Sequence, residues 1–469
     1  MKETKIVCTI GPATNNVLVL EKMIKAGMNV ARVNFSHGTH ESHKLEFDNI
    51  KKARENTREP IGIMLDTKGP EYRIGNFKDG RVFIKPNAKF TFTSKEVLGD
   101  STIVSVTPKN IVKNLSQGDT VLVANGLVSF KVLDVKKDFV VCRCISGGEL
   151  FDRKSMNFPE KLVTRQFLSS RDKDDLIFGI QNDIDMVACS FVSTKNDALS
   201  VRKFLDENGG KNIDIIAKLE NQSGIDNIDD ILDVADGIMI GRGDMGVELP
   251  IEKLPEVQKM IIKKCQARGK TVVTATEMLE SMINNPRPTR AEVSDVANAV
   301  YDGSSAVMLS GETAVGKYPI EAVETMAKVA RATEIVIDYA KRFNNLKPIE
   351  NNDLDAVCLS AVKLAVGTNS KLIVASSKTG KTIKSISRFQ SPIMVMGATT
   401  DKKAYYKLSI CYGVIPMLVE DYPTLNQLFD NMSKLAKEQF KLKKGDNIVI
   451  TGGIGDMTNT NLIKVEKIK

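Results

Sequence analysis

The chain has 469 residues, of which 42% are hydrophobic and 26% are charged. These proportions are those of an ordinary globular protein, and at about 150 residues per domain the length predicts about three domains. Trp is absent and aromatic residues make up only 6%, which disfavours a surface that stacks on nucleic acid. The net charge of +8 is spread along the chain and suits small anionic substrates.

The cysteines and the apolar runs indicate the compartment. Seven cysteines occur without the spacing of a disulfide framework, so we expect reduced thiols in a cytoplasmic protein. The N-terminal apolar run is too short for a secretory signal. No apolar stretch approaches the ~20 residues that cross a bilayer, so we expect no membrane partner. The low aromatic content and the spread positive charge lead us to expect no nucleic acid partner either.

Short, nearly all-apolar runs alternate with longer runs of helical period. Such apolar runs are typical of strands buried on both faces of a parallel sheet. They lie at 4–10, 29–35, 61–66, 185–191, 213–219, 237–241, 271–275 and 306–310. Eight strands, each followed sooner or later by a helix, predict a closed (β/α)8 TIM barrel, whose usual size is ~250 residues.

One connection breaks this alternation. Residues 71–167 contain short strand-like runs, turns rich in Gly, Asn and Asp, and no convincing helix. This pattern predicts an inserted antiparallel β-barrel domain that could act as a lid over the catalytic end of the barrel. We therefore expect a barrel built from residues 1–70 and 168–343. After a linker, residues 349–469 repeat the alternation and predict a smaller, open α/β domain.

Polar residues follow most of the barrel strands, where the working residues of such a barrel lie. Lys218 and Glu220 are two residues apart, so both can leave one strand on the same face, and Asp244 follows the next strand. Two carboxylates beside a lysine suit a divalent cation with oxygen ligands, Mg²⁺ rather than Zn²⁺. The alternative is a structural ion pair, but the polar ends of the neighbouring strands favour the metal site.

Backbone and side-chain groups near these strand ends suit an anion. Residues 241–244 (GlyArgGlyAsp) precede a segment that can start a short helix, whose N–H groups can hold a carboxylate or phosphate. Arg32, Lys68 and Arg73 add positive charge suited to phosphoryl groups.

The three histidines of the chain are His37, His40 and His43. Their spacing invites a zinc hypothesis, but side chains six residues apart on a helix do not converge easily. No cysteine or carboxylate pattern supports a zinc site either.

Together, the strand ends resemble those of pyruvate kinases, along essentially the whole chain. The resemblance rests on KIVCTIGPAT (5–14), AGMNVARVNFSHGTHE (26–41), LDTKGPEYRIG (65–75), IIAKLEN (215–221), ADGIMIGRGDMGVELP (235–250), TATEMLESMINNPRPTRAEVSDVANAVYDG (274–303) and AVMLSGETAVGKYP (306–319). It implies a barrel, an inserted lid and a C-terminal α/β domain. It also implies phosphoryl transfer from phosphoenolpyruvate to ADP, which gives pyruvate and ATP.

The resemblance implies catalytic roles for particular residues. Glu220 and Asp244 would bind Mg²⁺ (or Mn²⁺) that bridges substrate oxygens. Lys218 and Arg32 would neutralise the phosphoryl group, and Lys218 would also stabilise the enolate. Thr276 would help to deliver the proton that yields pyruvate.

Substrate, nucleotide and K⁺ sites follow from the same resemblance. The backbone of Gly243 and Asp244, with Thr276, would seat the substrate carboxylate. The residues that would face the ADP or ATP nucleotide are Asn34, His37 and Arg73. The K⁺ ligands, all of them oxygen donors, would be Asn34, Ser36, Asp66 and Thr67.

Glu71 carries an expectation of its own. Family members that require K⁺ resemble this sequence in having Glu at this position, whereas K⁺-independent members have Lys. We therefore expect the Glu71→Lys substitution to reduce K⁺ dependence.

The C-terminal domain contains a loop between strand and helix, 376–382, that can form a phosphate cradle. It resembles the sugar-phosphate effector loop of the family, with effector-binding residues Ser377, Thr379, Gly380 and Thr382; the effector would be a sugar phosphate or a nucleotide. The alternative is a simple capped helix start. A second loop, 451–459, departs from that of fructose-1,6-bisphosphate binders.

Departures from the family pattern lie mainly in and after the lid. Asn125 lies where the family usually has an acidic pair. Residues 155–160, from Ser155 to Glu160, replace the usual Gly-Val-Asn-Leu-Pro-Gly segment. Residues 166–169 and Glu277 also differ from the family pattern. They bear on lid closure, nucleotide preference and rate. Two alternatives follow: another Mg²⁺ barrel enzyme acting on pyruvate enolates, such as an aldolase, and a catalytically weakened regulatory paralogue. Homotetramers are usual in the family.

Overall fold

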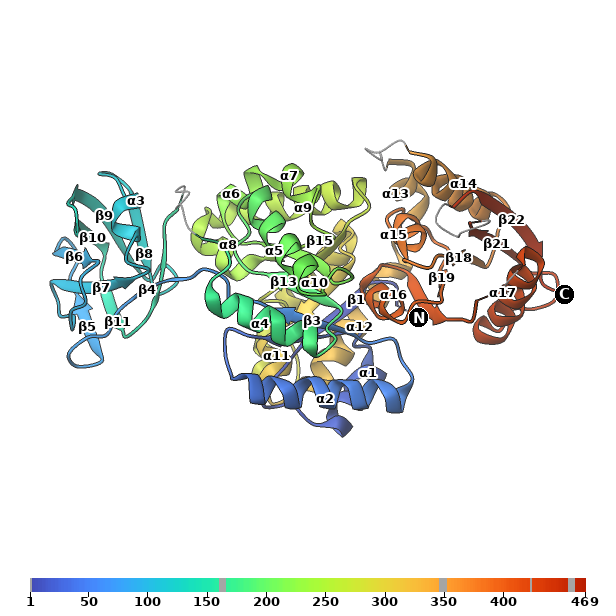
Figure 1. Cartoon of the computed structure of the whole chain (residues 1–469), viewed down its shortest axis with the longest axis horizontal. Helices are drawn as coiled ribbons and strands as arrows, with labels where there is room; N and C mark the ends of the chain where they lie inside the picture. Colours follow the sequence, from blue (N-terminus) through green and yellow to red (C-terminus); the bar gives the residue numbers. More distant parts are fainter. Residues whose placement is uncertain (1, 160–165, 346–351, 422–423, 454–459) are drawn as a thin grey trace.

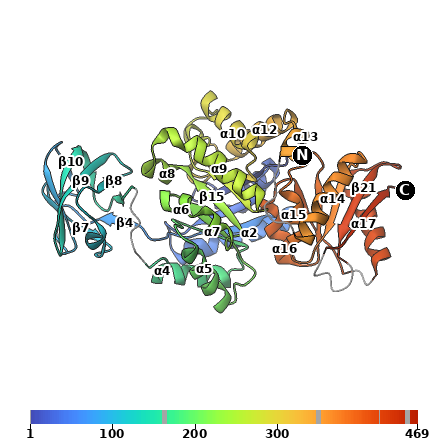
Figure 2. The ribbon, with the colours of Figure 1, turned by 90° about the horizontal axis from the view of Figure 1, so that it is seen from above.

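The computed structural model describes residues 2–159, 166–345, 352–421, 424–453 and 460–469. Three bodies lie in a row: a β domain at one end, a barrel in the centre and an α/β domain that carries the C-terminus (Figure 1, Figure 2). This is the three-part fold that the sequence predicts. Within the described residues, every helix is too short or too polar to span a bilayer.

The central barrel is closed by eight parallel strands in the part of the chain that the structure describes, in the order β1-β17-β16-β15-β14-β13-β3-β2. They are β1 (Lys5–Ile10), β2 (Val30–Asn34), β3 (Gly62–Asp66), β13 (Met186–Cys189), β14 (Asp214–Leu219), β15 (Gly237–Gly241), β16 (Thr271–Ala275) and β17 (Ala306–Leu309). Nearly all of their residues are buried, which explains the unbroken apolar runs. The predicted (β/α)8 barrel is confirmed.

The helices of the barrel domain lie around the barrel and at the ends of its strands. They are α1 (Val17–Ala26), α2 (His40–Thr57), α4 (Ser170–Gln181), α5 (Lys195–Glu207), α6 (Gln222–Asp226), α7 (Ile228–Leu232), α8 (Arg242–Glu248), η1 (Ile251–Lys253), α9 (Leu254–Ala267), η2 (Glu280–Ile283), α10 (Arg290–Asp302), α11 (Gly311–Ala314), α12 (Pro319–Ile335) and α13 (Tyr339–Asn345). Alternate residues of β1 enter two cores: Ile6 and Cys8 pack with the helices, whereas Val7 packs with residues inside the barrel. This alternation fixes which side chains point into the barrel.

The inserted domain forms a second closed barrel, in the order β10-β6-β7-β4-β12-β8-β9. Its strands, with the separate pair β5 and β11, are β4 (Tyr72–Ile74), β5 (Arg81–Ile84), β6 (Lys89–Thr93), β7 (Ile103–Thr107), β8 (Thr120–Val123), β9 (Val128–Val135), β10 (Phe139–Ser146), β11 (Gly148–Phe151) and β12 (Ser155–Asn157). Cys142 and Cys144 are buried in its core.

Two details of this domain differ from the expectation. The pair β6–β7 is parallel, not antiparallel, because the connection 94–102 is long enough to return the chain to the same end of the sheet. A short helix, α3 (Ile111–Asn114), is present where no convincing helix is predicted; Ile111 and Val112 are buried in the β-domain core.

The C-terminal domain is a sheet with strand order β20-β19-β18-β21-β22, in which β22 is antiparallel to β21. Its elements are α14 (Asp353–Gly367), β18 (Leu372–Ser376), α15 (Lys381–Ser387), β19 (Val395–Thr399), α16 (Lys402–Lys407), η3 (Leu408–Ile410), β20 (Val414–Leu418), α17 (Leu425–Phe440), β21 (Asn447–Gly452) and β22 (Leu462–Lys467). The Ser391 hydroxyl accepts a hydrogen bond from Ile393 N and holds a turn ahead of β19. The barrel interior is continuous with the core of this domain.

Candidate active site

Four charged side chains from three barrel strands form one chain of ion pairs. Arg32 Nε donates to Asp66 Oδ2 at 2.7 Å. Lys218 Nζ lies 3.1 Å from Asp66 Oδ1 and 3.1 Å from Glu220 Oε1. The strands β2, β3 and β14 bring these residues to the carboxyl-terminal end of the barrel.

Burial and neighbouring charges set the protonation of this group. Burial alone would lower the pKa of Lys218, but the Asp66 and Glu220 carboxylates raise it above its ordinary value. Burial would raise the pKa of Asp66, but Arg32 and Lys218 lower it. Lys218 and Asp66 are therefore charged at neutral pH.

Glu220 and Asp244 behave differently from Asp66. Burial, with the nearby Asp244 and Asp66 carboxylates, raises the pKa of Glu220 to about 7. Burial, with Glu71 and Asp66, raises the pKa of Asp244 above its ordinary value. A divalent cation between the two carboxylates would relieve this repulsion, so their oxygens fit a metal of the Mg²⁺ class. Among the described residues, no group of three or more His, Cys, Asp or Glu side chains is arranged to hold a metal alone.

The close approach of β14 and β15 requires glycine. A Cβ on Gly241 would lie 2.7 Å from Glu220 Cγ and 2.8 Å from its Oε1. Glu220 Oε2 accepts a hydrogen bond of 2.8 Å from Phe191 N. Gly241 and this bond together fix the carboxylate at the strand end.

The helix α8 follows β15 directly and carries Asp244 in its first turn. Gly243 N donates to Thr276 Oγ1 at 2.8 Å, and that hydroxyl donates to Ala275 O at 2.6 Å. The structure therefore brings together Gly243, Asp244 and Thr276, as the sequence analysis expects.

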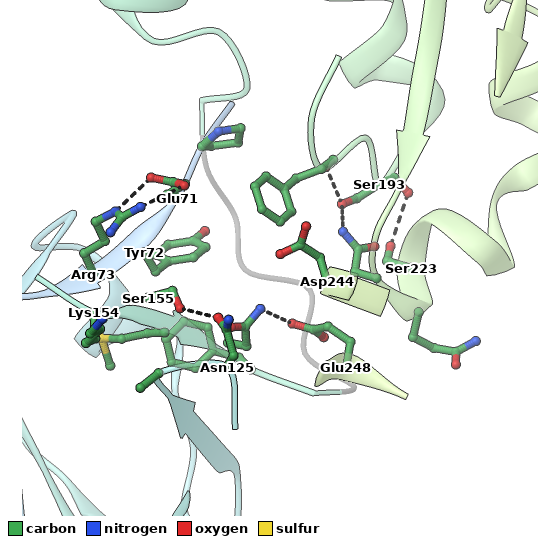
Figure 3. A pocket seen from close by; sticks show the side chains of 18 of the residues that line it. Glu71, Tyr72, Arg73, Asn125, Lys154, Ser155, Ser193, Ser223, Asp244 and Glu248 are labelled. Atoms are coloured by element: carbon green, nitrogen blue, oxygen red, sulfur yellow. Dashed lines mark hydrogen bonds and ion pairs between the residues drawn. The ribbon is translucent and has the colours of Figure 1, made fainter. Parts of the chain in front are cut away.

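A cleft of about 1040 Å³ lies between the β domain and the barrel. Asp244 lines it from the barrel side, and Glu71, Tyr72 and Arg73 line it from the other side (Figure 3). Arg32, Lys218, Glu220 and Thr276 are not among its lining residues, so Asp244 is the member of the charged group that reaches the cleft.

The expected nucleotide residues are placed unequally. Arg73 lines the cleft, where its Nε and Nη2 donate to Glu71 at 2.8 and 3.0 Å. His37 is exposed and is not a lining residue of the cleft. Burial alone would raise the pKa of Glu71, but Arg73 and Lys68 lower it.

The four expected K⁺ ligands lie at the ends of two paired strands, β2 and β3. Asn34 is opposite Asp66 in the register, and its side chain accepts from Ser36 N at 3.1 Å. Thr67 Oγ1 accepts from Ser190 N at 3.2 Å. The set offers oxygen donors only, which fits K⁺.

Ser190, after β13, is a member of this cluster that sequence reasoning missed. Lys218 Nζ donates to its hydroxyl at 2.7 Å, and the hydroxyl donates to Thr67 O at 2.7 Å. Thr9, the last but one residue of β1, was missed as well, and its hydroxyl accepts from Arg32 Nη1 at 2.7 Å. A hydroxyl at the end of a barrel strand was the available signal for both.

The histidines do not converge. His43 is buried, and its ring stacks on Phe35 and contacts Glu46 Oε2 at 2.9 Å through Nδ1. His40 contacts Asp175 instead, and His37 is exposed. The three rings therefore have separate surroundings.

The lid departures lie on the cleft wall. Ser155 Oγ donates to Asn125 Oδ1 at 3.1 Å, and both residues line the cleft. Glu160 lies outside the described residues. Across the cleft, Asn157 Nδ2 donates to Glu248 Oε1 of α8 at 3.2 Å, which links the lid to the helix that carries Asp244 (Figure 3).

The effector-type loop lies in the C-terminal domain, apart from this site. Gly380 has φ +78° and precedes α15, and Lys381 N lies 3.5 Å from Thr379 Oγ1. Ser377 and Thr382 are buried, and the Thr382 hydroxyl bonds to that of Thr460. Most of the second loop, 454–459, lies outside the described residues.

The closed parallel barrel, the inserted β lid and the charged strand ends define a class of lidded barrel proteins with a site suited to a metal and an anion. Models of the pyruvate kinase barrel domain and of the pyruvate kinase alpha/beta domain match residues 1–323 and 355–466. The chain belongs to the pyruvate kinase family.

Individual relatives agree over the full length. The pyruvate kinases of Clostridium perfringens and Clostridium acetobutylicum are 43% and 42% identical to this chain, and the match covers 100% of each protein. The crystal structure of a pyruvate kinase from Cryptosporidium parvum has a TM-score of 0.96 at 38% identity, over 100% of this chain and 96% of that one.

Proposed function

We propose that this chain transfers the phosphoryl group of phosphoenolpyruvate to ADP and so forms pyruvate and ATP. The observation that carries the proposal is the chain of ion pairs Arg32–Asp66–Lys218–Glu220, with Asp244 beside it at the floor of the lidded cleft. Such transfer depends mostly on positioning and on stabilisation of charge, which these residues supply.

In this proposal each residue has one task. Lys218 and Arg32 neutralise the phosphoryl group, and Lys218 then stabilises the enolate that is left behind. Glu220 and Asp244 would hold Mg²⁺ or Mn²⁺, which when bound supplies Lewis-acid charge to the substrate oxygens. Asn34, Ser36, Asp66 and Thr67 would hold K⁺.

The remaining tasks are binding and proton delivery. Gly243 and Asp244 seat the substrate carboxylate together with Thr276, whose hydroxyl helps to protonate the enolate. Arg73 and His37 face the nucleotide as the lid closes. A cytoplasmic homotetramer, and domains at 1–70 with 168–343, 71–167 and 349–469, belong to the same proposal.

A coupled assay tests this function. Purified chain is supplied with phosphoenolpyruvate, ADP, Mg²⁺ and K⁺, and pyruvate is measured through lactate dehydrogenase. We expect turnover that requires all four components. An aldolase would cleave a hydroxy keto acid instead, and a regulatory paralogue would form no pyruvate; the described site residues carry no substitution that favours the latter.

Replacing Glu71 by lysine is expected to reduce the dependence on K⁺. Glu71 lies against Arg73 and 3.5 Å from Lys68, so a lysine there adds fixed positive charge four residues after Thr67, one of the expected K⁺ ligands. The measurement is the ratio of activities with and without K⁺. A Glu149→Lys variant, on the lid side of the same cleft, is the control. Equal K⁺ activation in wild type and Glu71→Lys would contradict the idea.

A sugar phosphate is expected to shift the phosphoenolpyruvate saturation curve to lower concentrations. The loop 376–382 supplies hydroxyls and lysines next to the start of α15. A sugar monophosphate such as glucose 6-phosphate is titrated against wild type and against a Thr379→Ala variant, which should respond less, because loop 451–459 departs from that of fructose-1,6-bisphosphate binders. An unchanged curve with wild type would argue for a loop without an effector.

A further inference from the structure

The segment after β16 has a backbone that its residues rarely adopt. Thr276 has φ +67° and Glu277 has φ +53°, so two successive non-glycine residues are left-handed. Such a backbone conformation is strained for any residue with a side chain, and a β-branched threonine is among the least tolerant. The surrounding structure must therefore hold this turn in place.

Arg242 holds it. Its Nη2 donates to Thr276 O at 2.6 Å and to Glu277 O at 3.1 Å, and its Nε lies 3.3 Å from Ala275 O. Asp295 of α10 contacts Arg242 Nη1 at 2.8 Å and fixes the guanidinium from the other side. One side chain thus binds the carbonyls of three consecutive residues.

The same turn is fixed a second time through the threonine hydroxyl. Thr276 Oγ1 accepts from Gly243 N, the residue next to Arg242 on α8. The strained turn is therefore tied at its carbonyls and at its hydroxyl to the first turn of the helix that carries Asp244. Its hydroxyl cannot move independently of that helix.

We propose that Arg242 is a positioning residue for proton delivery: it holds the Thr276 hydroxyl where the enolate carbon is protonated. This inference rests on the proposed function. In that step the enolate π electrons form a C–H bond with the delivered proton, and the hydroxyl that passes the proton on regains one from solvent. Lysine cannot replace arginine here, because it lacks the planar fork of donors that reaches three carbonyls and a carboxylate.

The test separates the two halves of the reaction. Phosphoryl transfer is measured as ATP formed from phosphoenolpyruvate in a single turnover. Proton delivery is measured as exchange of the pyruvate methyl hydrogens in D₂O with ATP and Mg²⁺, followed by NMR. Arg242→Ala should slow the exchange about 10²-fold and phosphoryl transfer by no more than about tenfold, because only the hydroxyl is displaced.

Added guanidinium should restore part of the exchange in Arg242→Ala, and Arg242→Lys should not recover it. Asp295→Asn leaves Arg242 in place and should lower the exchange rate to an intermediate value. This variant keeps the test available if Arg242→Ala is unstable. The control is Arg268→Ala, which removes an arginine that pairs with Asp229 and Asp233 at the outside of the barrel.

Three results would overturn the inference. If Arg242→Ala slowed phosphoryl transfer and methyl-hydrogen exchange equally, or left the exchange rate unchanged, Arg242 would have a structural role at most. A wild-type chain that forms no pyruvate in the coupled assay would refute the proposed function, and this role with it. Wild-type turnover with unaffected Arg242 variants would refute this role alone.

Discussion

Replacing Lys218 by methionine is expected to lower kcat by about 10³-fold. Its ammonium is held between Asp66 and Glu220, 3.1 Å from each, and in the proposed function it is the cation that stabilises the charge on the phosphoryl group and the enolate. Methionine keeps the length of the side chain and removes the charge. The measurement is steady-state turnover per folded molecule, at saturating phosphoenolpyruvate, ADP and Mg²⁺.

The same variant leaves two buried carboxylates without their shared cation, and breaking such a group costs roughly 3–5 kcal/mol of stability. Urea unfolding must therefore accompany the kinetics, so that lost activity is not mistaken for lost fold. Lys195→Met is the matched control, because Lys195 pairs with Asp233 at the surface. A folded Lys218→Met chain with kcat within a few-fold of wild type would remove Lys218 from the mechanism.

Replacing Asp244 by asparagine is expected to weaken the binding of Mn²⁺ by about 10²-fold. The substitution removes a charged oxygen ligand, and charged oxygens dominate the affinity of proteins for hard cations. Asp244 reaches the cleft, and burial, with the Glu71 and Asp66 carboxylates, raises its pKa although Lys218 opposes the shift. Mn²⁺ binding is followed by electron paramagnetic resonance, which needs no turnover.

The control for this substitution is Asp226→Asn. Asp226 lines the same cleft and accepts a hydrogen bond of 2.7 Å from Gln222. If both variants weakened Mn²⁺ binding equally, the effect would come from the general charge of the cleft and not from a ligand at position 244.

The barrel could be predicted from the sequence because its signal is local. Strands buried on both faces give unbroken apolar runs, and the carboxyl ends of those runs carry Arg32, Asp66, Lys218 and Glu220. Parallel strands in a closed barrel bring these ends together whatever the connections do. The spacing of Lys218 and Glu220 thus translates directly into one face of one strand.

Contacts made by backbone atoms or across long separations were not predictable. Arg242 binds the backbone carbonyls of residues more than thirty positions away in the sequence. Every residue has the same backbone carbonyl, so the sequence does not indicate which ones Arg242 contacts. The left-handed turn at Thr276 and Glu277 contains no glycine, which is the residue that would have indicated such a turn in the sequence. Ser190 offered only a hydroxyl at the end of a strand, and only the closed barrel places that hydroxyl beside Lys218.

The lid shows the same limit. Its short alternating strands predicted a β domain, but the parallel pairing of β6 with β7 depends on where the connection between them returns. The hydrogen bond between Asn157 and Glu248 joins residues of two domains, and neither side chain alone indicates a partner.

A crystal structure with Mn²⁺ and a non-transferable analogue of phosphoenolpyruvate tests the central claim most directly. Anomalous scattering should place Mn²⁺ between the carboxylates of Glu220 and Asp244, roughly 2.0–2.2 Å from an oxygen of each. The phosphoryl oxygens should lie within hydrogen-bond distance of Lys218 and Arg32. Mn²⁺ bound away from both carboxylates, or a phosphoryl group that Lys218 does not contact, would contradict the account.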